Sequence, residues 1–269
     1  MASQRAITDR PKTLLVACIT AAKEAAAFIR AQEMHRGGLE VREKQAADFV
    51  SDVDTGAETR IIDVMNRLVP GAVIVGEEMS PTATIAGETV IIVDPLDGTT
   101  NFLHGFPAYA VSIGAMTDGE LAAGVVLNIP TGDIYTVTRG GGAFLNSEPI
   151  RVSHIDLPGR ALVGTGFPFK NLEFIDRYVR QFERITRAQS GVRRAGSAAL
   201  DLAWVAAGRF DAFWELRLAP WDIAAGLLLV REAGGRVTDL EGRDIVPAHT
   251  PVVASNGHLH DWLLEMLNG

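Results

Sequence analysis

The nine residues that decide the interpretation of this chain are Asp94-Pro95-Leu96-Asp97-Gly98-Thr99-Thr100-Asn101-Phe102. They directly follow residues 89–93, a run of β-branched residues typical of a strand buried on both faces. The strand therefore leads into two carboxylates, Asp94 and Asp97, which stand three positions apart. Because Pro95 fixes its own φ and lacks an N–H donor, the turn can aim both carboxylates and the Leu96 carbonyl at one point.

The residues after these carboxylates are suited to an anion. Gly98 lets the backbone approach a ligand closely, and Thr99 and Thr100 offer amides and hydroxyls where a helix could begin. Carboxylates beside a phosphate would repel it unless cations lie between them, and hard oxygen ligands favour Mg²⁺ or Mn²⁺ over Zn²⁺. The simpler alternative is a turn with a capping aspartate. Phosphatases of the haloacid dehalogenase type are disfavoured, since their two aspartates stand two residues apart at the first strand.

Other acidic residues stand at the ends of predicted elements. Glu77 and Glu78 follow a short apolar strand, and Asp222 lies in the first turn of a predicted helix. Glu215 comes seven residues earlier, at the end of a strand. Each has an ordinary alternative, either a solvated surface acid or a charge that complements the helix dipole.

Composition narrows the class of protein. The chain has 269 residues, with 25 Lys and Arg against 33 Asp and Glu, for a net charge of −8. An acidic chain is a poor general binder of nucleic acids or anionic membranes. The single cysteine, Cys18, excludes an internal disulfide and a cysteine-based zinc site. Because no run of about 20 apolar residues occurs, we expect no membrane span and a cytoplasmic enzyme.

Hydrophobic patterns predict an α/β (α+β) fold in two lobes, residues 1–149 and 150–269. The first lobe should contain two helices and a mixed, largely antiparallel sheet, with helices at 11–32 and 54–69 and strands at 72–75, 89–93, 109–116, 121–127 and 134–138. The second should alternate strands at 161–163, 210–215 and near 252 with helices at 172–188, 198–207, 221–234 and from 259.

Three motifs together resemble the inositol monophosphatase family of magnesium-dependent, lithium-sensitive sugar phosphatases. They are Gly76-Glu77-Glu78, the stretch from Asp94 to Phe102, and Trp221-Asp222 with residues 223–226. Residues 194–203 and 206–211 are similar to the bacterial branch of that family, which includes the SuhB-type proteins. The resemblance covers roughly residues 12–265 and implies a layered α-β-α-β-α fold and a homodimer.

The resemblance also implies a set of metal ligands. Glu77, Asp94 and the Leu96 carbonyl would hold a first Mg²⁺ ion. Asp94, Asp97 and Asp222 would hold a second, and a third, looser ion would sit near Glu77 through waters. Mn²⁺ could replace Mg²⁺ at these oxygen ligands.

The resemblance also implies roles in catalysis and substrate binding for other residues of this chain. The amides of Gly98 and Thr99 would bind phosphate, and Asp54 would orient the Thr99 hydroxyl. Lys44 would belong to the family's mobile loop and reach the phosphate region, where Ser51 stands in place of a more usual Thr. The residues implied to line the sugar pocket, together with Asp222, are Gly196, Ser197, Ala198 and Glu215.

The predicted function is Mg²⁺-dependent hydrolysis of a phosphate monoester by a metal-activated water, with myo-inositol 1-phosphate as the preferred substrate. Glu77 and Thr99 would position the water, and Asp97 could relay a proton to the leaving oxygen. Three other substrates stay open, namely fructose 1,6-bisphosphate, histidinol phosphate and nucleotide bisphosphates. A different class of function stays open, namely partnership with the transcription machinery as in SuhB-type proteins. It is supported only by the Arg193-Arg194 pair and by the general resemblance.

Overall fold

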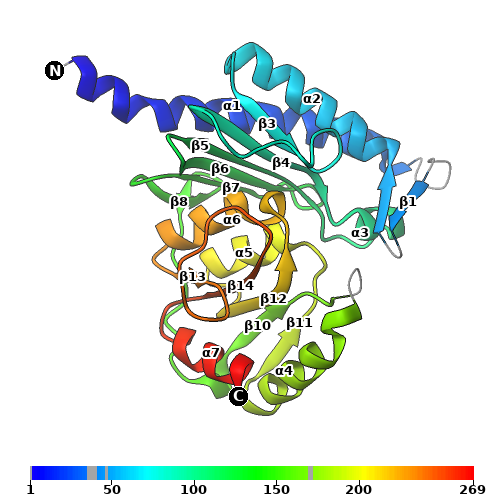
Figure 1. Ribbon diagram of the computed structural model, residues 1–269, viewed down its shortest axis with the longest axis vertical. Helices are drawn as coiled ribbons and strands as arrows, with labels where there is room; N and C mark the ends of the chain where they lie inside the picture. The colour runs from blue at the N-terminus through cyan, green and yellow to red at the C-terminus, as the bar shows by residue number, and fades with distance from the viewer. Residues whose placement is uncertain (1, 35–40, 46–47, 169–171) are drawn as a thin grey trace.

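The computed structural model describes residues 2–34, 41–45, 48–168 and 172–269, with the backbone alone described for 2–9, 41–45 and 48–51. Five layers follow one another from the top to the bottom of Figure 1. They are α1 with α2, a seven-stranded sheet, α5 with α6, a five-stranded sheet, and α4 with α7. The predicted α-β-α-β-α layering is therefore confirmed.

The first sheet has the order β3-β4-β5-β6-β7-β8-β9. Only β3 and β4 pair in parallel, so the sheet is mixed and largely antiparallel, as predicted. The elements of this part are α1 (Ala2–Gln32), α2 (Asp52–Leu68), β3 (Val73–Gly76), β4 (Thr89–Asp97), α3 (Thr99–His104), β5 (Ala110–Thr117), β6 (Glu120–Asn128), β7 (Ile134–Thr138), β8 (Gly142–Leu145) and β9 (Glu148–Pro149).

The second sheet has the order β11-β10-β12-β14-β13. Strand β10 pairs in parallel with β11 and β12, whereas β14 runs antiparallel to β12 and β13. Its elements are η2 (Pro158–Arg160), β10 (Leu162–Thr165), η3 (Leu172–Phe174), α4 (Ile175–Ala188), β11 (Gly191–Arg193), α5 (Ala198–Ala206), β12 (Ala212–Leu218), α6 (Pro220–Glu232), β13 (Arg236–Thr238), β14 (Thr250–Ser255) and α7 (His260–Asn268).

Strand β4 shows why the sequence produces stacked layers. Its side chains alternate between two hydrophobic cores, because successive residues of a strand point to opposite faces. Ile91 and Val93 pack into the core below α1 and α2, while Ile92 packs into the core that contains α5 and α6. All three are fully buried, so the continuous β-branched run is explained by burial on both faces.

Small residues let α6 lie against the first sheet. A Cβ atom on Gly114 of β5 would stand 2.6 Å from the Cβ of Ala224, and one on Gly124 of β6 would stand 3.1 Å from the Cα of Ala225. The helix therefore approaches the sheet closely at this point. This contact matters for the site below, because α6 begins with the Asp222 segment.

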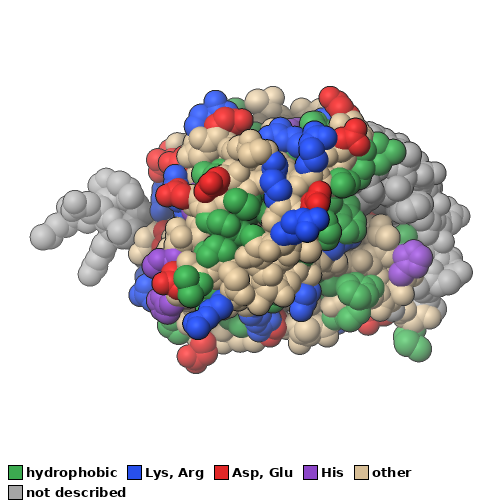
Figure 2. Space-filling model, turned by 90° about the horizontal axis from the view of Figure 1, so that it is seen from below, with side chains coloured by type: hydrophobic (Ala, Val, Ile, Leu, Met, Phe, Trp, Pro, Cys, Tyr) green, Lys and Arg blue, Asp and Glu red, His purple; other side chains and the backbone are tan. Residues whose placement is uncertain are grey.

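The outer layer closes the second sheet from below. Tyr178 of α4 and Leu263 of α7 pack on Trp214 of β12, which is fully buried. The face seen from below shows positive, negative and apolar side chains lying among one another (Figure 2). In the described parts of the chain, no helix is long and apolar enough to span a membrane.

Several boundaries differ from the sequence prediction. Helix α1 begins at Ala2, not near residue 11, and carries Pro11 inside it, since a proline disfavours but does not forbid helical backbone around it. Residues 41–45 and 48–51 form a β-hairpin, β1 (Val41–Gln45) and β2 (Asp48–Ser51), where no strand was predicted. Strands β8, β9, β11 and β13 were also missed, because two to four residues carry too little periodicity to recognise.

The chain passes from the first sheet to the second between Pro149 and Leu162. The lobe boundary at residue 149/150 stays a prediction. One hydrophobic core contains residues of both sheets, Ile92 and Phe213 among them, so the two halves pack on each other directly.

Candidate active site

The parallel pair β3 and β4 brings the first acidic residues together. Gly76 pairs with Val93, and the Glu77 amide donates to the Val93 carbonyl at 3.2 Å. Glu77 and Asp94 therefore leave the same edge of the sheet on neighbouring strands. Asp94 is 1% exposed, and its Oδ1 accepts a hydrogen bond from the Leu96 amide at 3.0 Å.

A break in strand pairing turns the next carboxylate toward the same place. The pairing of β4 with β5 shifts between Asp94, opposite Ser112, and Asp97, opposite Ala110. This irregularity contains Pro95, whose missing donor suits an interruption of the ladder. The predicted role of the turn in aiming both carboxylates is consistent with this geometry.

The electrostatics of Asp94 show that four carboxylates lie close to one another. Burial raises the pKa of Asp94 well above its ordinary value, and the charges of Glu77, Asp97 and Asp222 raise it further, against the Leu96 amide, which lowers it. Ionised together, these groups would repel one another strongly in a buried setting. The segments after β3, at the end of β4 and at the start of α6 therefore converge.

Asp97 and Asp222 each accept hydrogen bonds that fix one of their oxygens. Asp97 Oδ2 accepts from Ser197 Oγ and from the Ala199 amide, both at 2.7 Å. Asp222 Oδ2 accepts from the Ala219 amide, also at 2.7 Å, which closes the first turn of α6. One oxygen of each carboxylate is thus held in place by the fold.

The carboxylates are near one another but do not surround a single point. Across the described residues, no three acidic, histidine or cysteine side chains form a ready metal site. The donor set nevertheless suits a hard divalent cation, because it consists of carboxylate oxygens and a backbone carbonyl without sulfur.

Thr99 connects the site to α2. Its hydroxyl lies 2.8 Å from Asp54 Oδ1 and 3.1 Å from the Leu96 carbonyl oxygen. Asp54 is buried, so it is held as a fixed acceptor. The predicted pairing of Asp54 with the Thr99 hydroxyl is present in the structure.

Two glycines allow the loops of the two halves to meet. Gly98 has φ of 99° and Gly196 has φ of 92°, both in the left-handed region. A Cβ on Gly98 would stand 2.9 Å from the Ala108 carbonyl oxygen. Asn101 Nδ2 donates to that same oxygen at 2.6 Å and to the Ala195 carbonyl at 2.8 Å, and so joins the α3 turn to the loop before α5.

A cavity of about 420 Å³ lies at this meeting point. It is lined by most residues that the sequence singled out, namely Glu77, Asp94, Leu96, Asp97, Gly98, Thr99, Gly196, Ser197, Ala198, Glu215 and Asp222. Asp54 stands behind Thr99 rather than on the cavity wall. Lys44 lies in β1, whose side chains are outside the described part of the chain, so its predicted role stays a prediction.

Sequence reasoning missed three charged residues near the cavity. Glu58 is fully buried in α2 and accepts from the Glu78 and Met79 amides, at 2.8 and 3.0 Å, so it holds the turn after Glu77. A glutamate on the apolar face of a helix was the pattern that could have revealed it. Arg194 and Asp201, unlike Glu58, line the cavity itself, although Arg194 had been interpreted as part of a surface pair.

The sequence model of the inositol monophosphatase family matches residues 11–268. The chain belongs to this family. An inositol-1-monophosphatase of Caulobacter vibrioides is 42% identical over 236 residues, covering 85% of this chain and 91% of that protein. A protein of Pseudomonas aeruginosa named Nus factor SuhB is 44% identical over 222 residues, covering 81% of this chain and 82% of the relative.

A solved structure agrees with the family assignment. The extragenic suppressor protein SuhB of Bartonella henselae superposes with a TM-score of 0.89 at 38% identity, covering 95% of this chain and 98% of the other. The inositol monophosphatase fold is thereby established for this chain. The family model and the relatives named inositol-1-monophosphatase support a phosphatase activity.

Proposed function

We propose that this member of the inositol monophosphatase family hydrolyses myo-inositol 1-phosphate, or a closely similar polyol phosphate, with Mg²⁺ as cofactor. The observation that carries the proposal is the meeting of four carboxylates in the lining of a cavity that is also lined by Gly98 and Thr99. The carboxylates are those of Glu77, Asp94, Asp97 and Asp222. Carboxylates can lie beside a bound phosphate only when cations between them offset the repulsion of their negative charges.

The acidic residues would divide into two overlapping ligand sets. Glu77, Asp94 and the Leu96 carbonyl would hold one ion, and Asp94, Asp97 and Asp222 a second. A third, looser ion near Glu77 and the use of Mn²⁺ belong to the same proposal. When bound, such ions supply positive charge that lowers the pKa of water and stabilises a leaving oxygen.

The chain's own groups would orient the reactants. The Thr99 hydroxyl donates its proton to Asp54 and so keeps a lone pair available to accept a hydrogen bond from the attacking water, with Glu77 on the other side. The Gly98 and Thr99 amides would hold the phosphate oxygens. Asp97, fixed by Ser197 and Ala199, would orient a water that gives its proton to the leaving oxygen.

The part of the cavity lined by Glu215 favours a polyol. Glu215 offers a carboxylate that can accept hydrogen bonds from several hydroxyl groups, and Gly196, Ser197 and Ala198 leave room beside it. A second phosphate placed against Glu215 would meet a like charge. Fructose 1,6-bisphosphate and nucleotide bisphosphates are therefore the less favoured substrates, and histidinol phosphate, whose ammonium group a carboxylate would accept, stays as the alternative.

A substrate panel tests this proposal. Phosphate release would be measured for inositol, fructose, histidinol and nucleotide phosphates, with Mg²⁺ and with a chelator. We expect the highest kcat/KM for inositol 1-phosphate and no turnover with the chelator. Preference for another substrate by tenfold or more would overturn the substrate assignment, and turnover that survives chelation would overturn the metal requirement.

The family resemblance adds three further proposals. We expect inhibition by Li⁺, a homodimer and a cytoplasmic location. Inhibition curves with LiCl, sedimentation equilibrium and cell fractionation would measure them in turn.

A second candidate function is association with the transcription machinery. It is favoured by the 44% identity to the Pseudomonas aeruginosa protein named Nus factor SuhB. Copurification of RNA polymerase with both the wild type and Asp94→Asn would support such a role. Failure of both proteins to copurify it would argue against the role.

A further inference from the structure

Helix α2 carries two buried carboxylates next to the site. Asp54 and Glu58 stand four residues apart, so they lie on one face of the helix, about 6 Å apart along its axis. Asp54 is 1% exposed and Glu58 is fully buried, and neither side chain is part of the cavity lining. Because a buried carboxylate needs polar partners, the partners of these two acids indicate what each of them does.

The partners of Glu58 belong to the turn that carries Glu77. Glu58 Oε2 accepts a hydrogen bond from the Glu78 amide at 2.8 Å, and Oε1 accepts one from the Met79 amide at 3.0 Å. These amides directly follow Glu77, which lines the cavity and leaves β3 beside the strand that carries Asp94. Both oxygens of Glu58 therefore hold backbone donors of this one turn.

Gly76 shows how closely the turn packs on Glu58. A Cβ atom on Gly76 would overlap the Glu58 carboxylate, and Gly76 does not have a positive φ. What this position requires is therefore the absence of a side chain rather than an unusual backbone. The base of the turn is closed separately, since the Gly76 amide donates to Ser80 Oγ at 2.9 Å and that hydroxyl donates to the Ile74 carbonyl at 3.0 Å.

The partner of Asp54 lies in the other loop of the site. Asp54 Oδ1 accepts from the Thr99 hydroxyl at 2.8 Å. The proposed function gives Thr99 and Glu77 the joint task of orienting the attacking water. Both groups are held from one helix, which packs on β4 in the first core. The spacing of Asp54 and Glu58 on α2 therefore helps to fix the distance between the two loops.

We propose that Glu58 is a positioning residue for the metal site, which holds the Glu77 carboxylate ready for the divalent cation. The inference rests on the proposed function, because it requires Glu77 to be a ligand. Glu58 lies outside the cavity lining, so it touches neither substrate nor cation. Without Glu58, the turn has to be ordered when the cation binds, and the affinity for the cation falls by that cost.

Calorimetric titration of Mg²⁺ into the metal-free wild type and into Glu58→Gln tests the inference. Glutamine keeps the volume of the side chain but places an NH₂ donor against one of the two backbone donors. We expect Mg²⁺ to bind at least tenfold more weakly to the variant. The Glu78 and Met79 amides of the metal-free variant should also exchange hydrogen at least tenfold faster. Unchanged Mg²⁺ affinity would overturn the inference.

The dependence of turnover on Mg²⁺ distinguishes positioning of a ligand from a part in the chemistry. Glu77 is still present in Glu58→Gln, so a high Mg²⁺ concentration should restore the occupied site. We expect the half-saturating Mg²⁺ concentration for inositol 1-phosphate hydrolysis to rise at least tenfold, with kcat at saturating Mg²⁺ within threefold of the wild type. A large fall in kcat that added Mg²⁺ does not restore would contradict the assigned role.

Asp211 provides a matched control. It is a buried acid that also uses both oxygens, accepting from Ser153 Oγ and from the Leu162 amide, and it is not part of the cavity lining. Asp211→Asn should lower the urea midpoint but leave the Mg²⁺ affinity within threefold of the wild type. If Asp211→Asn and Glu58→Gln weaken Mg²⁺ binding alike, the effect of Glu58 is a general loss of structure and the inference is wrong.

Gly76→Ala tests the same contact from the side of the turn and replaces Glu58→Gln if that variant does not fold. Its methyl group should displace the Glu58 carboxylate and weaken Mg²⁺ binding at least tenfold. In a Glu58→Ala background the methyl group has room, so Gly76→Ala should weaken binding there by no more than threefold. Equal effects in both backgrounds would overturn the inference. Absence of Mg²⁺ binding by the wild type would instead overturn the proposed function, and this inference with it, so the two failures are distinguishable.

Discussion

Thr99 is the residue whose hydroxyl links the candidate site to the helix behind it. The hydroxyl lies 2.8 Å from Asp54 Oδ1, and Asp54 is held in a buried position on α2. We expect Thr99→Ala to lower kcat by about 10- to 1,000-fold. This range is typical for the loss of a group that transfers a proton or orients a reactant. Steady-state phosphate release at saturating Mg²⁺ would measure this.

Thr99→Ser is the control for that change, because serine keeps the hydroxyl and removes only a methyl group. It should retain at least a third of the wild-type kcat. Asp54→Asn should resemble Thr99→Ala, and the double variant should be little worse than either, since both remove one interaction. Full activity of Thr99→Ala would contradict the assigned role.

The turn between β4 and α3 is the element on which the site depends. Gly98 has φ of 99°, and a Cβ there would stand 2.9 Å from the Ala108 carbonyl oxygen. Gly98→Ala therefore combines a strained backbone with a clash, and we expect it to lower the free energy of unfolding by about 2–4 kcal/mol. Urea titration followed by circular dichroism would measure the loss.

Gly119 distinguishes the backbone strain from the steric clash, the two causes of the loss expected for Gly98→Ala. It has φ of 80° in the hairpin between β5 and β6, and a Cβ there would meet nothing within 4 Å. Gly119→Ala should therefore cost only about 1 kcal/mol, from the backbone conformation alone. Equal losses in the two variants would show that the Ala108 contact contributes nothing.

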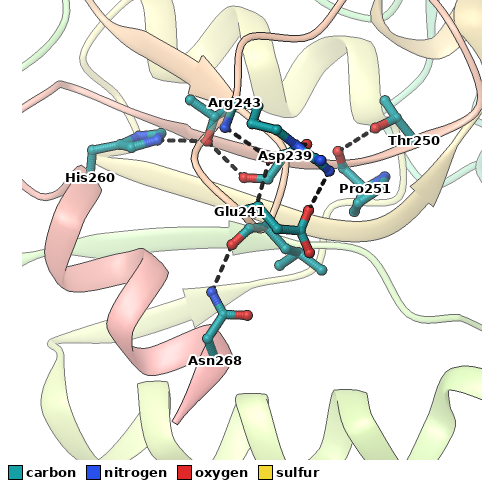
Figure 3. A network of polar contacts seen from close by, with 9 residues as sticks. Asp239, Glu241, Arg243, Thr250, Pro251, His260 and Asn268 are labelled. Carbon is teal, nitrogen blue, oxygen red and sulfur yellow. Dashed lines mark hydrogen bonds and ion pairs between the residues drawn. The ribbon is translucent and has the colours of Figure 1, made fainter.

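A buried histidine, His260 at the start of α7, contacts strands β13 and β14 of the second sheet. Figure 3 shows its ring directed toward the segment that contains Asp239. His260 is fully buried, with Nε2 2.9 Å from Thr238 Oγ1 and Nδ1 3.0 Å from Ser255 Oγ. Burial, and to a lesser extent the charge of Arg236, lower the pKa of His260 to about 4, while the charge of Asp261 acts in the opposite direction. The folded protein therefore keeps this imidazole neutral.

The consequence is a stability that depends on pH. Between about pH 6.5 and pH 4 the unfolded chain binds a proton that the folded chain does not, so stability falls as the pH is lowered through that window. The loss attributable to His260 is about 3 kcal/mol at most. Urea midpoints at pH 7 and pH 4 should fall less in His260→Gln than in the wild type.

His258 is the control, because it is exposed and only two residues away. His258→Gln should show the same fall in stability between pH 7 and pH 4 as the wild type. If His260→Gln behaves in the same way as His258→Gln, the buried imidazole is not responsible for the acid sensitivity.

At the scale of elements, sequence patterns predicted the structures that depend on residues close together in the chain. The β-branched residues before Asp94 predicted a strand buried on both faces, and β4 is such a strand. Asp201 could not be found in this way, because its burial results from the packing of α5 against β12. Glu58 was missed for the same reason, since the turn that it holds comes 20 residues later in the chain.

On the scale of the whole molecule, the site exists only because both sheets and the layer between them are assembled. Asp94 comes from the first sheet, Asp222 from α6, and Glu215 from the second sheet. The sequence predicted the layered fold through its family resemblance and the alternation of its elements. The cavity is lined by residues from all of these layers, and no local pattern describes contacts between segments so far apart in the sequence.

Divalent cations should therefore stabilise the molecule as a whole. An ion that binds only the folded chain raises the free energy of unfolding by RT ln(1 + [ion]/Kd), which is about 2.7 kcal/mol at one hundred times Kd. Because the ligands come from both halves, we expect one unfolding transition that moves upward with Mg²⁺ rather than two that move separately.

The central claim is that the carboxylates around Asp94 hold Mg²⁺, and calorimetric titration of Mg²⁺ into the wild type and into Asp94→Asn tests it most directly. The account predicts saturable binding of about two ions by the wild type. It also predicts at least a tenfold weaker affinity in the variant, which removes the carboxylate shared by both proposed ligand sets. Equal affinities in the two proteins, or no saturable binding by the wild type, would contradict the account.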